Sequence, residues 1–98
     1  MGVPGPLHRT INDAHESAAR AFAHAVAAER TAIRAHQQAT VLHEHRAKQL
    51  GWLADQAVNG ARRDSLLRQA ETELTRANAA SGRANLARQR LIDEGETP

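Results

Sequence analysis

Small apolar residues recur through the first half of the chain at alternating steps of three and four positions. This spacing places the side chains on one face of an α-helix, as in the core positions of a coiled coil. We therefore predict that the face is a helix–helix interface, widened by neighbouring apolar positions and continued at Leu53. The repeating positions are Ile11, Ala14, Ala18, Ala21, Ala25, Ala28, Ala32, Ala35, Ala39 and Leu42, and their apolar neighbours are Phe22, Val26 and Ile33.

The second half of the chain carries a similar series, which begins with alternating leucine and alanine. Polar Ser81 and Arg88 occupy two positions of this series. Large leucines on one helix can fit over small alanines on the other, so we expect the two series to face each other. The apolar members expected at the interface are Leu67, Ala70, Leu74, Ala77, Ala84 and Leu91.

Glycine and proline set the expected boundaries. Both residue types are absent between Leu7 and Leu50, which predicts a long helix. Asn59-Gly60 is the expected stop, because both residues tolerate a left-handed helix terminus. We predict a flexible leader over residues 1–9, a hairpin over residues 10–93 and a flexible tail over residues 94–98. Within the hairpin we expect one helix at about 10–58, a turn at about 59–62 and a second helix at about 63–92.

Helix caps are expected at polar residues near these boundaries. Thr10 or Asn12 is suited to cap the first helix, and Asp64 or Ser65 the second, because their side chains can accept a free backbone N–H. Gly51 leaves open a break in the first helix.

A turn this short predicts an antiparallel all-α hairpin. The first helix should extend about 25 Å beyond the second, at about 1.5 Å per residue. The apolar residues on this extension need another surface, and buried alanines remove little area from water. We therefore expect a homodimer or another homo-oligomer, most simply a four-helix bundle.

Composition excludes several classes of protein. Alanine supplies 21 of the 40 hydrophobic residues, which makes a conventional compact core difficult to build. The absence of cysteine excludes disulfides and thiolate metal sites. No apolar run is long enough to cross a membrane, and residues 1–9 do not resemble a signal peptide. A cytoplasmic location is expected, with signal-peptide-independent export left open.

The histidines do not form a metal motif. His43 and His45 diverge by about 200° on a helix, so one chain cannot bring them and His36 together. The three serines lie outside any nucleophile motif, and no glycine-rich phosphate loop occurs. We expect no catalytic site, no metal and no cofactor, while a histidine site shared between two chains stays open.

Basic residues gather in two places and allow an alternative function in nucleic-acid binding. One group flanks the turn and the other lies in the second helix, but neither contains an aromatic residue for base stacking. The net charge is only +2 with histidine neutral, which does not favour nucleic acid as the partner. The two groups are Arg46, Lys48, Arg62 and Arg63, and Arg76, Arg83, Arg88 and Arg90.

Two resemblances add to this description. Trp52 lies just before the expected turn of a hairpin of about this length, which is similar to the dimeric WXG-type hairpins of type VII secretion, although Gly51-Trp52-Leu53 differs from Trp-x-Gly. The segments 34–39 and 42–47 loosely resemble repeats in Ala- and His-rich actinobacterial helical proteins of unknown function.

The expected function is that of a non-enzymatic structural or adaptor protein, which binds itself or a helical protein partner. A secreted WXG-like hairpin and a basic nucleic-acid accessory protein are the alternatives.

Overall fold

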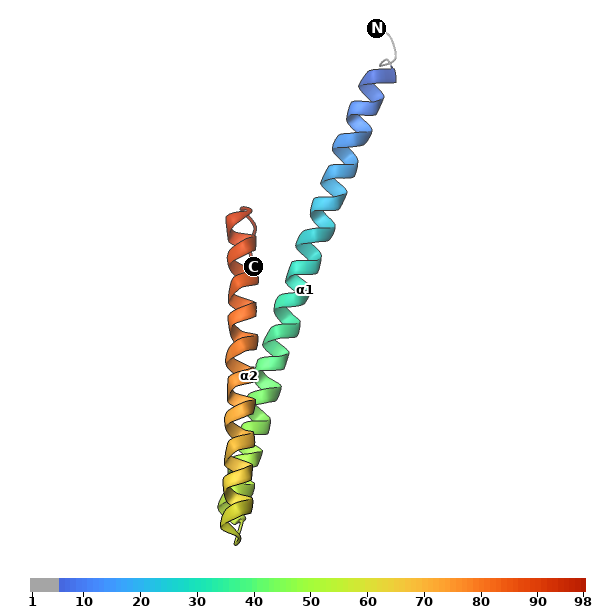
Figure 1. Ribbon diagram of the computed structural model, residues 1–98. Coiled ribbons are helices and arrows are strands. Elements are labelled where there is room, and N and C mark those ends of the chain that lie inside the picture. Colours follow the sequence, from blue (N-terminus) through green and yellow to red (C-terminus); the bar gives the residue numbers. More distant parts are fainter. Residues whose placement is uncertain (1–5) are drawn as a thin grey trace.

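The computed structural model describes residues 6–98, which form two helices joined by a short turn. Helix α1 spans Pro6–Gln56 and helix α2 spans Gly60–Asp93. The helices run antiparallel from the turn, as Figure 1 shows. No strand occurs among residues 6–98. The prediction of an all-α helical hairpin is confirmed.

The hairpin is a rod. Its principal extents are 87 × 18 × 14 Å and its radius of gyration is 23.7 Å. A compact domain of this length would have a radius of gyration of about 13 Å. The molecule therefore has a single line of contact between two helices instead of a central core.

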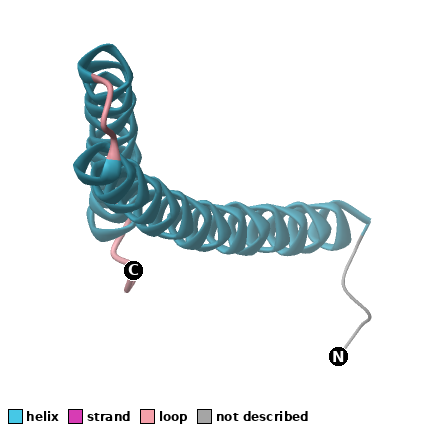
Figure 2. Cartoon of the chain, turned by 90° about the horizontal axis from the view of Figure 1, so that it is seen from below, coloured by secondary structure: helices cyan, strands magenta, loops and turns pink. Residues whose placement is uncertain are grey.

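Helix α1 is much longer than its partner. All side chains from His8 to Ala25 are exposed, and Val26 is the first buried residue of α1. Figures 1 and 2 show this N-terminal part of α1 leading away from α2. At about 1.5 Å per residue, the part of α1 before Val26 is about 30 Å long. We call residues 6–25 the overhang.

The core between the helices follows a heptad spacing. In α1 the buried positions lie seven residues apart, with half-buried Thr40 completing the series. Val26 and Ile33 form a buried cluster with Ala87 and Leu91 of α2. The buried residues are Val26, Ile33, Ala47 and Ala54 in α1, and Leu66, Ala77, Ala80, Ala84, Ala87 and Leu91 in α2.

This core differs by one residue from the alanine series predicted for α1. Ala25 and Ala32 lie one position before Val26 and Ile33, and one residue turns a helix by about 100°. The physical reason is side-chain size. Facing Val26 and Ile33 towards α2 removes more apolar area from water than facing alanines there.

The turn is capped differently from our expectation. Asn59 has φ −84° and ψ 126°, and its side-chain oxygen accepts hydrogen bonds from the backbone N–H groups of Ala61 (2.8 Å) and Arg62 (3.2 Å). Asn59 is thus the N-cap of α2, and neither it nor Gly60 is left-handed. Because α2 already begins at Gly60, the predicted caps Asp64 and Ser65 lie inside the helix.

The N-terminal boundary also differs from the prediction. Pro6 begins α1, and proline is favoured at the first position of a helix because the N–H it lacks would be unpaired there. Thr10 and Asn12, the predicted caps, lie inside α1. Residues 6–9 of the predicted leader are helical, and residues 1–5 of it lie outside the described residues.

Gly95 ends α2. Its φ is +80°, its N–H donates to the Ile92 carbonyl (2.9 Å), and the N–H of Glu96 donates to the Leu91 carbonyl (2.8 Å). This pair of bonds is a Schellman motif, which uses a glycine because the left-handed conformation strains other residues. The expected flexible tail is therefore ordered at its start.

Gly51 does not interrupt α1, which continues through it to Gln56.

Within residues 6–98, neither helix has a stretch that is both long enough and apolar enough to cross a membrane.

Candidate protein–protein interface

A continuous line of apolar residues lies on the surface of α1. We call the ten repeating positions from Ile11 to Leu42 the α1 stripe. Ala32 and Ala39 are half-buried beside α2, and the other eight members are exposed. Ile11 and Leu42, at the two ends, are each 47% exposed, and so is Phe22 beside the stripe. The members of the α1 stripe therefore share one face, most of which α2 leaves open, whereas the predicted neighbours Val26 and Ile33 are buried against α2.

The predicted interface residues of α2 divide into two groups. Ala77, Ala84 and Leu91 are buried against α1, and Ala70 is half-buried. Leu67 and Leu74 are 44% and 49% exposed, because the α2 core continues instead through the positions just before them, at Leu66 and Glu73. In α1, Leu53 is 40% exposed. These leucines border the hairpin core without entering it.

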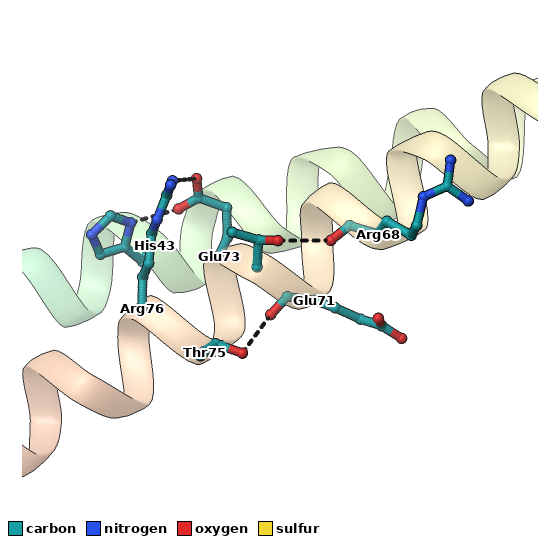
Figure 3. Close-up of polar contacts among 7 residues, drawn as sticks. His43, Arg68, Glu71, Glu73, Thr75 and Arg76 are labelled. Atoms are coloured by element: carbon teal, nitrogen blue, oxygen red, sulfur yellow. Dashed lines mark hydrogen bonds and ion pairs between the residues drawn. The ribbon is translucent and has the colours of Figure 1, made fainter.

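A polar cluster connects the helices midway along the hairpin. His43 of α1 donates through Nδ1 to Oε2 of Glu73 in α2 (2.5 Å), and Arg76 pairs with Glu73 Oε1 (3.0 Å). Figure 3 shows His43 and Arg76 converging on this carboxylate. The His43 hydrogen bond lowers the pKa of Glu73, and the positive charges of Arg76 and Arg46 act in the same direction. The Glu73 side chain is only 12% exposed, and its two partners replace part of the water around the carboxylate.

A second polar group marks the level at which α2 ends. Arg90 of α2 forms an ion pair with Glu29 of α1, with 2.7 Å between Nη2 and Oε1. Arg30 donates to the backbone carbonyl of Thr97 (2.9 Å) and lies 3.5 Å from the Glu96 carboxylate. These contacts hold the chain after α2 against α1, near Val26 and Leu91.

The three histidines in the middle of α1 have different surroundings. His43 is engaged by Glu73, His36 is half-buried on the side of α1 that faces α2, and His45 is exposed. Among the described residues, no three His, Cys, Asp or Glu side chains lie close enough together to hold a metal ion.

Several of the basic residues have partners within the chain. Arg76 and Arg90 pair with carboxylates, as described above, and Arg88 donates to Asn85 (2.8 Å). Near the turn, Arg63 donates to the Ala57 carbonyl (3.1 Å). These internal contacts leave fewer guanidinium hydrogens for a phosphate backbone.

Sequence reasoning did not identify the residues that hold the two helices in register through polar contacts. Glu73 occupies a core position of α2, and Glu29 and His43 lie along the same side of α1 at a spacing of two heptads. Carboxylates at core spacing were the available signal, but their partners come from the other helix and depend on its register.

Comparison of the chain with protein families, with curated proteins and with solved structures finds no match.

Proposed function

We propose that this protein is a non-enzymatic helical structural or adaptor protein that acts by self-association through α1. One observation carries the proposal. Eight of the ten members of the α1 stripe stay exposed in the single chain, and the stripe continues through the overhang, where α2 cannot cover it.

The overhang supports the proposal because its side chains from His8 to Ala25 are all exposed and none packs against α2. Helices in proteins gain most of their stability from packing an apolar face. The overhang has 20 residues and exposes Ile11 and Phe22. A second helix on this face would stabilise the overhang and remove both side chains from water.

Light scattering and sedimentation equilibrium test self-association. We expect a dimer or a larger species at micromolar concentration. Ala28→Leu should weaken association by about 1–3 kcal/mol, because close contact between helices leaves no room for a larger side chain. Ala27→Leu is the matched control, since Ala27 is also exposed but lies on another face of α1. A monomer throughout this concentration range contradicts the proposal.

A second candidate function rests on Trp52, which is 63% exposed in α1 close to the turn. This placement is similar to that in WXG-type hairpins of type VII secretion, for which the activity would be export of a dimeric hairpin. Dependence of export on a type VII system would favour this candidate. Retention in the cytoplasm with that system present would exclude it.

A further inference from the structure

The α1 stripe is symmetric about its own centre. Its steps of three and four residues read the same from either end, with a large residue at each end and alanines between. When an identical helix is laid on the stripe in the opposite direction, Ile11 meets Leu42 and the alanines meet each other. The centre of this arrangement falls between Val26 and Ala27. All ten positions then have an apolar partner, as they would in a parallel pair, so the direction depends on where α2 lies.

Charged residues avoid the same face of α1. Between Thr10 and His45, only Glu29 lies beside the stripe, and its carboxylate is already paired with Arg90 at 2.7 Å. A partner helix could therefore cover the stripe without burying an unpaired charge, which would be costly. The other six charged residues of this segment lie on the opposite face, and they are Asp13, Glu16, Arg20, Arg30, Arg34 and Glu44.

The end of α2 coincides with the centre of the stripe. Leu91 packs against Val26, and Arg90 pairs with Glu29, so α2 covers α1 only on the C-terminal side of that centre. The two-fold axis of an antiparallel pair is perpendicular to the plane of the two helices and keeps both copies of α2 on one side. The two α2 helices then cover different halves of the α1 pair and do not compete for the same space.

The overhang favours the antiparallel direction over the parallel one. In a parallel pair, each overhang would contact only the other overhang, through Ile11 and alanines and with no α2 at that level. In the antiparallel pair, each overhang lies along the part of the second α1 that α2 already supports. This direction also places opposite ends of the two helix dipoles together.

We propose that a second copy of this chain covers the α1 stripe in antiparallel orientation, with the two-fold axis between Val26 and Ala27. This inference rests on the self-association proposed above and adds its direction and register. Small residues at the contact allow the helix axes to approach to about 8 Å, at the short end of the usual range.

Cysteine cross-linking tests the direction, because the natural chain has no cysteine. Ala18→Cys and Ala35→Cys are suitable variants, since both positions are exposed in the single chain. In the antiparallel dimer, residue 18 of one copy faces residue 35 of the other. Two copies of the same variant hold their thiols about 26 Å apart along the axis, at about 1.5 Å per residue. Ala23→Cys, on the opposite face, is the control.

The variants are refolded separately and as mixtures, oxidised with glutathione, and compared by non-reducing electrophoresis beside sedimentation of the unmodified protein. The mixture of Ala18→Cys and Ala35→Cys should give a disulfide-linked dimer, and each variant alone and any mixture with Ala23→Cys should not. Cross-linking of Ala18→Cys with itself would mean a parallel pair and would overturn the inference. A sedimenting dimer without the mixed cross-link would also overturn it, while leaving self-association intact. A monomer at every concentration would overturn both.

Discussion

Glycine-to-alanine substitutions should change the stability of this hairpin in opposite directions at different positions. Gly51 and Gly82 lie inside α1 and α2, and an added Cβ at either would meet no atom within 4 Å. Gly95 also has open space around it, but its φ of +80° is left-handed. The same chemical change therefore tests the backbone alone, without new packing.

The expected magnitudes follow from these backbone conformations. At Gly51 and Gly82, alanine should raise the free energy of unfolding by about 0.5–1 kcal/mol, because glycine loses more backbone entropy in a helix. At Gly95, alanine should lower it by about 1–2 kcal/mol, the cost of a side chain in the left-handed region. In a domain of this size, 1 kcal/mol corresponds to about 4–8 °C in Tm.

Urea titrations and thermal melts followed by far-UV circular dichroism measure both quantities. All variants must be compared at one protein concentration, because association adds to apparent stability. The double variant Gly51→Ala/Gly82→Ala should show the sum of the two single effects, since distant sites are usually additive.

A neutral or destabilising effect of Gly51→Ala would refute the reasoning about α1. It would mean that the backbone at Gly51 is not in the regular helical conformation that α1 has there. If Gly95→Ala has no effect, α2 does not end in the Schellman motif.

Three further predictions concern packing, charge and capping. Leu91→Ala should lower the free energy of unfolding by about 2–5 kcal/mol in urea titrations, because Leu91 is fully buried, whereas Leu86→Ala, at a position 63% exposed, should change it by less than about 0.5 kcal/mol. Glu73→Gln should flatten the acid side of a stability–pH profile. Folding lowers the pKa of Glu73 below its ordinary value of 4.5, so the carboxylate stabilises the fold above about pH 4.5, and this contribution is lost as pH falls through the lowered pKa. Equal acid sensitivity of the two proteins would contradict this. Asn59→Ala should cost about 0.5–2 kcal/mol in thermal melts and Asn59→Asp should restore most of it, because aspartate can accept the same backbone hydrogen bonds; a failure of rescue would argue against the N-cap.

Local chemistry in the sequence was sufficient to predict the two helices and their antiparallel connection. The long segment without glycine or proline, rich in alanine and arginine, favours a helix whatever surrounds it. The difference in helix length and the exposed overhang follow from the position of the Asn59 turn. The sequence left open whether the first helix breaks at Gly51. The helix does not break there, because a single glycine costs only about 1 kcal/mol in a helix that is otherwise well formed.

The rotation of α1 about its axis was decided only by the tertiary structure. In a helix so rich in alanine, several faces are nearly equal in apolar character, so periodicity identified a regular face without showing which face meets α2. Val26, Ile33 and Leu91 select that face because they bury more area than alanine. The pairs His43–Glu73 and Glu29–Arg90 then depend on this rotation and on the register of α2. These pairs join residues 30 and 61 positions apart, so they form only once both helices are placed, and no local pattern contains that information.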